Sequence, residues 1–430
     1  MKGVLKDWEK MKSLPVAVLG GGVSGQGVCS LLKRLGWRYR VFKDEGVELT
    51  PSKLRSSSLV VVSPGFRPGH PWLVMARELK VIVLGELDFA SCFLTSPITA
   101  ITGTNGKTSL ATLLCHALHK LGYKAKVAGN IGYSLSQLIA DSVSMDERIL
   151  LEVSSFQARG LSHLKPEVGV WTNFAEDHLD YHASIEDYFQ SKLSLISGCD
   201  DGIFVGSSVR VWARRLSIDL PKKTTVVPVH SELNYPDQKD HFLNSYPQQE
   251  NFSLALAYAS SLGIERQDFV KACEDYKPEP YRLSKVSEIN EISFWNDSKA
   301  TNFEAAIAAC RSMKDTIFWI GGGQSKGGLI DEFARQISEF ASQSFTIGEV
   351  GEDLAKKIKD FGSSATQCFS LREALECAYS EANGKVSILF SPGFASFDQF
   401  DDYNQRGDFY NKYVFDLKKR FATSAQELLY

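Results

Sequence analysis

Residues 101–109, ITGTNGKTS, combine a glycine turn with a lysine and several hydroxyl side chains. The closing G-K-T matches the end of the phosphate-binding P-loop, G-x-x-x-x-G-K-[ST]. Ile101 stands where that loop opens with glycine, and the glycine that is present, Gly103, makes the loop shorter. Lys107 can reach terminal phosphates, and Thr108 offers a hydroxyl to Mg²⁺. The stretch therefore predicts a nucleotide site of a subclass with a short loop; the alternative is an ordinary turn with a solvated lysine.

Acidic residues and a histidine follow the next strands. Glu152 ends the apolar run ILLEV, and TNFAEDHLD places Asp177, His178 and Asp180 just beyond another strand. The carboxyl ends of parallel strands form the ligand crevice of an open sheet, so these groups are expected to converge with Lys107. Carboxylates and imidazole suit a divalent cation. For the two aspartates, loop solvation or helix capping remains an equal alternative.

A second glycine loop lies near the N-terminus. Gly20, Gly22 and Gly25 form G-x-G-x-x-G between a strand and a helix, which by itself suggests a nicotinamide or flavin dinucleotide. Such enzymes place an acidic residue about 20 residues further on, and Asp44 and Glu45 lie near that point. The motif indicates an anion or nucleotide at this helix and leaves the cofactor open.

The last third of the chain holds a further polar cluster. FWNDSKATN contains Asp297, Lys299 and Thr301, where an aspartate can bind a ribose and a lysine a phosphate or carboxylate. Composition alone favours an exposed turn. The same holds for Arg282, Lys326 and the segment SPGFASFDQF.

Short β-rich runs alternate with helical patterns along the whole chain, which predicts an α/β fold with parallel sheets. VAVLGGG and PITAIT each begin a strand–loop–helix unit, and TIFWIGGG, SFTIGE and VSILFSPGF predict strands of a third unit. We expect three domains, residues 1–92, 93–280 and 281–430.

Composition narrows the class of protein. The 430 residues are 43% hydrophobic with a formal net charge of -3, so folded cores are expected and neither a nucleic acid nor a membrane surface is an expected partner. No apolar run approaches the roughly 18 residues of a membrane helix, and the N-terminus has no signal-peptide core. The eight cysteines form no C-x-x-C pair, which indicates buried thiols in a reducing compartment. We expect a soluble, cytoplasmic monomer.

In this order, TGTNGKT, GNIG, LEVSSFQ, TNFAEDHLD and NDSKATN resemble the Mur ligase family, the ATP-dependent amino-acid ligases of peptidoglycan assembly. The resemblance covers essentially the whole chain, and TGTNGKT is similar to the family's shortened ATP loop. NDSKATN and SPGFASFDQF…RG are similar to the branch that adds D-glutamate. The resemblance implies a Rossmann-like N-terminal domain for a UDP-sugar, a central P-loop ATPase-type domain, and a Rossmann-like C-terminal domain for the amino acid.

The resemblance also implies ligands and site residues. The substrates would be ATP, D-glutamate and UDP-MurNAc-L-alanine, with two Mg²⁺ ions. Lys192, which composition alone assigns to a helix surface, matches the family lysine that is carbamylated. The implied catalytic residues are Lys107, His178 and Lys192, and the implied metal ligands are Thr108, Glu152, His178 and Lys192. The implied ATP-binding residues are Gly103, Thr104, Asn105, Gly106, Lys107, Thr108, Ser109, Asn251, Arg282, Asp297 and Lys299. The implied UDP-sugar residues are Gly22, Ser24, Gly25, Ser63, Gly65, Asn130 and Ser154, and those for D-glutamate are His178, Thr301, Lys326, Ser396 and Phe397.

Three other functions remain open at this point. A different Mur-type ligase or a folylpolyglutamate synthase-like ligase would share the ATP loop. A nicotinamide-dependent oxidoreductase would use the N-terminal glycine loop but would leave TGTNGKT without a role. A nucleotide-binding regulator without turnover would retain the loop without needing the carboxylate, histidine and lysine set.

Overall fold

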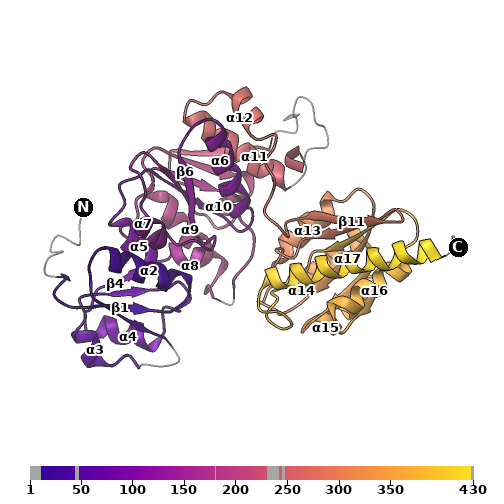
Figure 1. Cartoon of the computed structure of the whole chain (residues 1–430), viewed down its shortest axis with the longest axis horizontal. Coiled ribbons are helices and arrows are strands. Elements are labelled where there is room, and N and C mark those ends of the chain that lie inside the picture. Colours follow the sequence, from indigo (N-terminus) through magenta and orange to yellow (C-terminus); the bar gives the residue numbers. More distant parts are fainter. Residues whose placement is uncertain (1–10, 44–47, 180, 230–241, 245–246, 428–430) are drawn as a thin grey trace. The chain divides into compact units, whose positions relative to one another are not determined.

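The computed structural model describes residues 11–43, 48–179, 181–229, 242–244 and 247–427, and these form three β-sheets (Figure 1). Asp44, Glu45 and Asp180 lie outside the described residues. Contacts group the chain into two compact units. The first unit holds the N-terminal and central sheets, and the second holds the C-terminal sheet together with Ala175–His182.

The N-terminal sheet has four parallel strands in the order β2-β1-β3-β4. Its elements are β1 (Val16–Leu19), α2 (Val23–Arg34), β2 (Tyr39–Phe42), α3 (Pro51–Arg55), β3 (Val60–Val62), α4 (Pro71–Glu78), β4 (Val83–Gly85) and α5 (Glu86–Ser91). Alternate residues of β1 point to opposite faces. Val16 and Val18 share a core with α2 and α5, whereas Ala17 and Leu19 pack with α3 and α4. Helices therefore cover both faces (Figure 1), and the strand order reverses between β1 and β3, where open α/β sheets bind ligands.

The central sheet has six parallel strands in the order β10-β9-β8-β5-β7-β6. Its strands are β5 (Ile98–Thr102), β6 (Ala125–Gly129), β7 (Arg148–Glu152), β8 (Val168–Trp171), β9 (Gly202–Gly206) and β10 (Thr224–Val227). Its helices are α6 (Lys107–Lys120), α7 (Leu135–Ala140), α8 (Ser155–Ala158), α9 (Ile185–Ser197), α10 (Ser207–Arg215), α11 (Gln248–Ser261) and α12 (Arg266–Ala272), with a 3₁₀ turn η1 (Phe242–Asn244). All five residues of β5 are buried, as expected for a strand covered on both faces.

One continuous apolar core joins the N-terminal and central sheets. Asp88 of α5 is buried, and its carboxylate accepts hydrogen bonds from the backbone N–H groups of Ser162, His163 and Leu164 in the central part. Gly27 of α2 lies so close to α7 that a Cβ there would be 2.0 Å from the Ser134 hydroxyl oxygen. These contacts explain why the two sheets form one compact unit.

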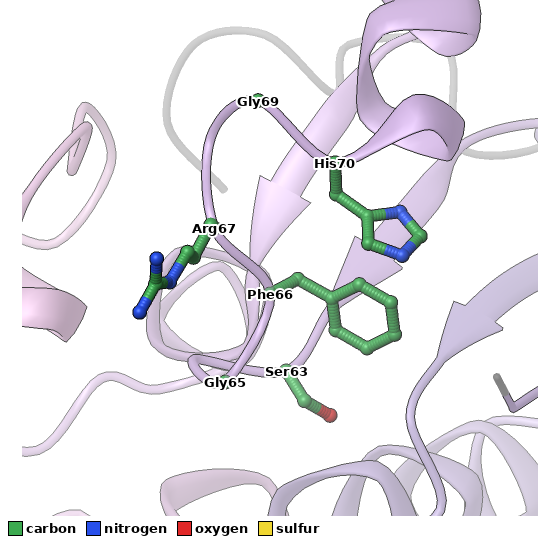
Figure 2. Close-up of a pocket in the computed structure, with 6 residues that line it drawn as sticks. All are labelled: Ser63, Gly65, Phe66, Arg67, Gly69 and His70. Carbon is green, nitrogen blue, oxygen red and sulfur yellow. The ribbon is translucent and has the colours of Figure 1, made fainter. Parts of the chain in front are cut away.

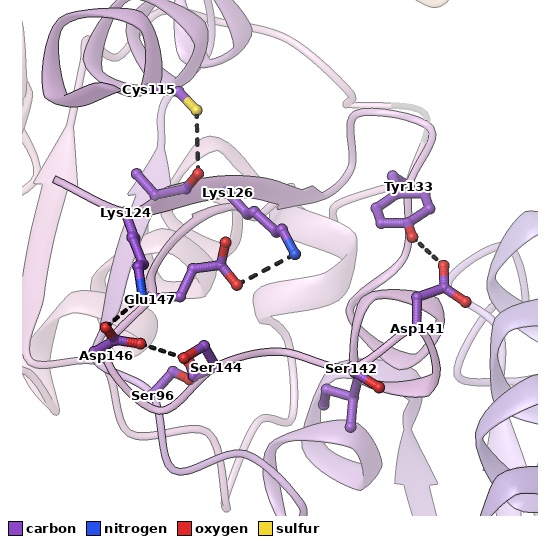
Figure 3. Close-up of polar contacts among 12 residues, drawn as sticks. Ser96, Cys115, Lys124, Lys126, Tyr133, Asp141, Ser142, Ser144, Asp146 and Glu147 are labelled. Carbon is purple, nitrogen blue, oxygen red and sulfur yellow. Dashed lines mark hydrogen bonds and ion pairs between the residues drawn. The ribbon is translucent and has the colours of Figure 1, made fainter. Parts of the chain in front are cut away.

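Strand β6 is an edge of the central sheet, and Figure 3 shows the charged side chains around it. Lys126 on β6 pairs with Glu147 at 3.2 Å, and Lys124 just before it pairs with Asp146 at 2.8 Å. Exposed pairs of this kind contribute little to stability, because water and salt screen them. Lysines on an edge strand also oppose pairing with another chain, so we read this surface as protection of the edge.

The C-terminal sheet has the order β11-β12-β16-β13-β14-β15, with β11 antiparallel to β12 and the other neighbours parallel. Its strands are β11 (Ser284–Ile289), β12 (Ile292–Asn296), β13 (Thr316–Gly322), β14 (Ala341–Ile347), β15 (Ser364–Gln367) and β16 (Val386–Phe390). Its helices are α13 (Phe303–Ser312), α14 (Ile330–Phe340), α15 (Gly351–Asp360), α16 (Leu371–Glu381) and α17 (Tyr403–Glu427). Ile388 and Phe390 pack with α16 and α17, whereas Leu389 packs with α13, α14 and α15.

The predicted α/β fold with three parallel-sheet domains is confirmed, and the antiparallel β11 is an addition that the alternating pattern did not indicate. The domain limits at 92/93 and 280/281 remain predictions. Among the described residues, no helix is both long and apolar enough to cross a membrane.

Candidate active site

The phosphate loop connects β5 to α6 and depends on its two glycines. Gly103 has φ 148° and Gly106 has φ 80°, backbone conformations that side chains disfavour. A Cβ on Gly103 would be 1.8 Å from the Thr172 hydroxyl oxygen, and one on Gly106 would be 2.5 Å from Asn251 Oδ1. Ile101, at the position of the absent glycine, is a buried residue of β5. The loop is therefore short because the strand continues through the place where the longer loop begins.

Two lysines converge on this loop. The Lys107 ammonium donates to the carbonyl oxygens of Gly103 and Thr104, both at 2.9 Å, and the Lys192 ammonium donates to the Gly103 carbonyl at 2.8 Å. Lys192 is only 1% exposed, although it lies on the amphipathic helix α9. The interpretation of Lys192 as a solvated surface lysine is therefore wrong, because the helix turns this residue toward the sheet.

Tyr188, one turn before Lys192 on α9, lines the same place. Its hydroxyl lies 3.2 Å from the Thr104 hydroxyl, and the Lys192 ammonium lies 4.6 Å from the centre of its ring. Tyr188 is buried and packs against Phe174. Sequence reasoning did not identify Tyr188; its i, i+4 spacing from Lys192 was the available signal.

Thr108 and Glu152 also meet. The Thr108 hydroxyl donates to Glu152 Oε2 at 2.7 Å, and the Asn130 amide donates to Glu152 Oε1 at 3.2 Å. Glu152 is 2% exposed at the end of β7, next to β5. A buried carboxylate beside a hydroxyl at a helix N-terminus offers the oxygen ligands that Mg²⁺ prefers. Within the described residues, no group of three or more His, Cys, Asp and Glu side chains could hold a metal ion by itself.

The other nucleotide residues on the first unit lie around the loop. Ser109 is buried in the first turn of α6, and Asn251 of α11 approaches Gly106. Asn251 is 4% exposed, which agrees with a residue that packs on the loop. Its contact with a nucleotide base stays a prediction.

The glycine loop of the N-terminal sheet lies where β1 and β3 end. Gly22 precedes α2, and a Cβ on Gly25 would be 2.0 Å from the Gly20 carbonyl oxygen, so this glycine permits close packing of helix and strand. Ser63 follows β3 and is in contact with Gly20. Ser63 and Gly65 line a pocket of ≈ 760 Å³ together with Phe66, Arg67, Gly69 and His70 (Figure 2).

The other predicted UDP-sugar residues divide between the two sheets. Ser24 lies in the first turn of α2 and is half-buried. Asn130 and Ser154 follow β6 and β7 of the central sheet, and the Asn130 N–H donates to the Glu152 carbonyl at 2.9 Å. The Ser154 hydroxyl caps α8 in a capping box with Gln157. Contact of these residues with a sugar nucleotide stays a prediction.

In the second unit, Asp177 joins three candidate site residues. Its carboxylate accepts a hydrogen bond from the Asn302 amide at 2.9 Å and lies 3.5 Å from both the Lys326 ammonium and His178 Nε2. Burial by itself raises the pKa of Asp177, but Lys326, His178 and Asn302 outweigh burial and hold this pKa below its ordinary value. Asp177 is therefore an ionised, mostly buried anchor, and the loop-solvation alternative does not describe it. His178 has φ 55°, which is a strained backbone conformation, and the contact of its ring with Asp177 helps to hold it.

The predicted residues of NDSKATN lie where β12 ends. Asp297 accepts hydrogen bonds from the Leu283 N–H at 3.0 Å and the Ser391 hydroxyl at 2.7 Å. Burial raises the pKa of Asp297 to about 7, although these two hydrogen bonds oppose the rise. The Lys299 ammonium lies 3.5 Å from the centre of the Tyr403 ring, and Thr301 is half-buried. Composition favoured an exposed turn for this segment, but most of its residues pack at the end of β12.

Arg406 ties this strand end to the segment SPGFASFDQF. Its guanidinium donates to the Ser298 carbonyl at 2.9 Å and to the Phe394 and Ala395 carbonyls, each at 3.3 Å. Arg406 is 1% exposed. In the same segment Ser396 is buried, whereas Phe397 is 68% exposed. The structure thus brings the strand end and this segment together. Asn302 and Arg406 lie in the quoted motifs NDSKATN and SPGFASFDQF…RG, but the sequence by itself assigned them no role of their own.

Arg282 lies between Tyr281 and Leu283, which have φ values of 60° and 48°. This strained turn leads into β11, and the Lys299 N–H donates to the Tyr281 carbonyl at 3.1 Å.

The four predicted metal ligands belong to different compact units of the chain. Thr108, Glu152 and Lys192 lie in the first unit, and His178 lies in the second. Their assembly around metal ions stays a prediction.

Comparison with known proteins places this geometry in a family. Residues 101–310, which include the phosphate loop and Lys192, match the model of the Mur ligase middle domain. A UDP-N-acetylmuramoylalanine–D-glutamate ligase of Synechocystis sp. is 31% identical over 440 residues, covering 91% of this chain and 97% of the relative. The enzyme of the same name from Caldicellulosiruptor bescii is 33% identical over 460 residues, covering 95% of this chain and 98% of the relative.

Solved structures agree at the level of the fold. The UDP-N-acetylmuramate–alanine ligase of Thermotoga maritima has a TM-score of 0.57 at 17% identity and covers 96% of this chain and 100% of its own. The MurF ligase of the same organism, solved with ADP, has a TM-score of 0.57 at 14% identity and covers 86% of this chain and 91% of its own. With relatives at this identity over nearly its whole length, and with the fold and loop described above, the chain belongs to the Mur ligase family.

Proposed function

We propose that this chain is an ATP-dependent ligase that joins D-glutamate to UDP-N-acetylmuramoyl-L-alanine and forms ADP and phosphate. The observation that carries the proposal is the arrangement at the short loop, where Lys107 and Lys192 share the Gly103 carbonyl beside the Thr108–Glu152 pair. The choice of D-glutamate and of the sugar nucleotide rests on the activity after which the full-length relatives are named. The protein would act as a cytoplasmic monomer in peptidoglycan precursor synthesis.

The three predicted domains divide the substrates. Residues 1–92 would bind the UDP-sugar at the end of β1 and β3, residues 93–280 would bind ATP, and residues 281–430 would bind D-glutamate. The pocket lined by Ser63 and Gly65 supports the first assignment. The Lys326–Asp177 contact supports the third, because a lysine held at a strand end can pair with a carboxylate of the amino acid.

The residues present fit one Mg²⁺ at the ATP loop. Thr108 and Glu152 provide a hydroxyl and a carboxylate within hydrogen-bonding distance of each other, at the carboxyl end of the central sheet. Bound Mg²⁺ would neutralise charge on the phosphates during transfer. We assign His178 and Lys192 to a second ion.

The two ammonium groups on one carbonyl support a carbamate on Lys192. Since Lys107 and Lys192 both donate to the Gly103 oxygen, their nitrogens are close enough to repel one another, and a magnesium ion would add to the positive charge. The Lys192 ammonium first loses a proton to become a neutral amine, and addition of CO₂ with loss of a second proton then gives a carboxylate-like carbamate anion. We therefore propose that Lys192 is carbamylated and acts as an oxygen ligand.

The reaction follows from the poor reactivity of a carboxylate. One alanyl carboxylate oxygen attacks the γ-phosphorus of ATP, the bond to ADP breaks, and an acyl phosphate forms. The neutral D-glutamate amine then attacks the acyl carbon, and phosphate leaves. Lys107 holds the β- and γ-phosphates through both steps, while Lys326, Thr301, Ser396 and Phe397 orient the amino acid.

Phosphate release with UDP-MurNAc-L-alanine and a panel of amino acids tests this function. We expect release to require ATP, the sugar nucleotide and D-glutamate together. Equal rates with L-glutamate, or activity with L-alanine on UDP-MurNAc that lacks its alanine, would contradict the assignment within the family. NADH binding would instead favour an oxidoreductase, and glutamate addition to a folate would favour a folylpolyglutamate synthase-like ligase.

A further inference from the structure

The first half of the phosphate loop is held by the residues that follow β8. The Thr104 N–H donates to the Asn173 carbonyl at 3.0 Å, and the Asn105 N–H donates to Asn173 Oδ1 at 2.8 Å. The Thr172 hydroxyl donates to the Asn105 carbonyl at 2.5 Å. Two consecutive loop amides are thus engaged by one asparagine.

Asn173 is itself fixed. Its carbonyl also accepts the Trp171 indole N–H at 3.0 Å, and the next N–H, of Phe174, donates to the Ser208 hydroxyl at the start of α10 at 3.1 Å. A Cβ on Gly206 would be 2.0 Å from the Thr172 carbonyl oxygen, so β9 packs tightly against this segment. The partner of the loop is therefore a rigid part of the central sheet.

These contacts divide the phosphate loop into a half that is hydrogen-bonded to Asn173 and a half that leads into α6. The Thr104 and Asn105 amides donate to Asn173, so this half of the loop is hydrogen-bonded to the segment after β8, whereas Gly106 directly precedes α6. The first amides of α6 have no partner within the helix, and they carry the positive end of its dipole. The shape of the turn before them depends on Asn173.

We propose that Asn173 is a positioning residue for ATP, whose side chain fixes the short phosphate loop in the conformation that presents the amides of Gly106 to Ser109. The loop lacks the opening glycine of the longer P-loop, and Asn173 supplies from the neighbouring strand part of the order that the longer loop builds from its own backbone. This inference rests on the proposed use of ATP at the loop.

Two variants separate positioning from general stability. Asn173→Ala removes the side-chain acceptor, whereas Asn173→Asp keeps an oxygen at the same place. Thr99→Val is the matched control: it removes a buried hydrogen bond of 2.8 Å to the Tyr258 hydroxyl from β5, the strand that leads into the loop, without touching the loop itself. KM for each substrate and amide hydrogen exchange over residues 103–106 are measured in the full-length protein.

For Asn173→Ala we expect KM for ATP to rise roughly tenfold, the effect of one lost hydrogen bond that pre-orders a site. KM for the sugar nucleotide and D-glutamate should stay within about twofold, and exchange over 103–106 should accelerate. Asn173→Asp should keep the protection from exchange, and Thr99→Val should leave KM for ATP unchanged.

Unchanged KM for ATP and unchanged exchange in Asn173→Ala would overturn the inference, as would an equal rise of all three KM values or the same rise in Thr99→Val. If Asn173→Ala does not fold, Asn173→Asp decides, since loss of protection despite its retained acceptor would also overturn it. A wild-type protein without ATP-dependent phosphate release would contradict the proposed function, whereas an active wild type with an unaffected Asn173→Ala contradicts only the role of Asn173.

Discussion

Among single residues, Lys192 shows that a place on an amphipathic helix does not by itself predict whether a lysine is exposed or what it binds. Sequence pattern assigns a lysine on an amphipathic helix to solvent, yet Lys192 is buried against the phosphate loop. Burial of a long cation has a cost unless the group is paired or changed in charge. Here it shares one carbonyl with a second lysine, which is a poor arrangement for two ammonium groups, and the proposed carbamate on Lys192 would remove their repulsion.

Lys192→Ala should lose roughly a hundredfold or more of the turnover, because a group that stabilises charge at the reacting phosphate is removed. Formate or acetate should partly restore activity by entering the vacated space as an anionic oxygen ligand. Lys192→Arg should not be rescued, since it keeps a positive charge and fills the space. The measurement is phosphate release with and without added formate.

The matched control is Lys126→Ala, which removes an exposed lysine of β6 and should change turnover little. Activity of Lys192→Ala within a few-fold of the wild type, together with an unmodified lysine mass at saturating bicarbonate, would contradict the carbamate proposal.

At the scale of elements, the strand–loop–helix units were predictable and their closest contacts were not. Apolar runs, glycines and helical patterns located β1 and β5 together with the helices that follow them, and an apolar run located β8. The pairing of Asn130 with Glu152 and of Asn302 with Asp177 depends on which strands are neighbours, and local sequence does not encode this. The buried states of Asp297 and Arg406 were missed for the same reason, because their partners are about a hundred residues away in the chain.

The loop between β5 and α6 gives a test of its glycine. Gly103→Ala places a Cβ against the Thr172 hydroxyl at a φ that alanine disfavours, a strain of about 1–3 kcal/mol. We expect ATP turnover to fall at least tenfold while the fold persists, measured by steady-state kinetics and thermal unfolding. Gly122→Ala is the control, since Gly122 also has positive φ but meets nothing within 4 Å. Equal activity of the two variants would contradict the account of the loop.

The contact of β12 with β16 through Asp297 predicts a pH dependence. Since burial raises the folded pKa of Asp297 to about 7, the neutral carboxyl favours folding. Its contribution is complete below the unfolded pKa of about 4 and is lost as the pH rises through about 7, with a total on the order of a few kcal/mol. Calorimetry from pH 5 to pH 8 should therefore show falling stability in the wild type.

Asp297→Asn should flatten that decline, because the amide can accept from the Leu283 N–H and donate to the Ser391 hydroxyl without titrating. The comparison is the difference in Tm between variant and wild type at each pH. A difference that does not change between pH 5 and pH 8 would show that Asp297 does not titrate in this range.

Across the whole molecule, the order of motifs predicted three sheets and a ligand for each, and family membership supports the same assignment. What sequence could not supply was the grouping of the sheets. The N-terminal and central sheets share one core and the Asp88 contacts, while Ala175–His182 groups with the C-terminal sheet. This grouping arises from contacts between segments far apart in the chain.

The two glycine loops lie on different sheets, which predicts that a change in the ATP loop leaves binding of the UDP-sugar intact. Lys107→Ala should abolish turnover, because the ammonium at the phosphate loop is lost. It should leave UDP-sugar affinity within about twofold, because the Lys107 ammonium donates to the Gly103 and Thr104 carbonyls of the phosphate loop and not to the N-terminal sheet. Calorimetric titration of UDP-MurNAc-L-alanine into both proteins measures this. Loss of sugar-nucleotide binding in the variant would contradict the division of substrates between the sheets.

In the proposed reaction ATP activates the alanyl carboxylate for attack by D-glutamate, and transfer of ¹⁸O from that carboxylate to phosphate reports on this activation. UDP-MurNAc-L-alanine labelled with ¹⁸O in both carboxylate oxygens is incubated with the protein, ATP, Mg²⁺ and D-glutamate. If an acyl phosphate forms, one labelled oxygen leaves with each inorganic phosphate and the other stays in the new amide, which mass spectrometry of both products detects. Phosphate that is released without ¹⁸O, or released at the same rate without D-glutamate, would contradict the account.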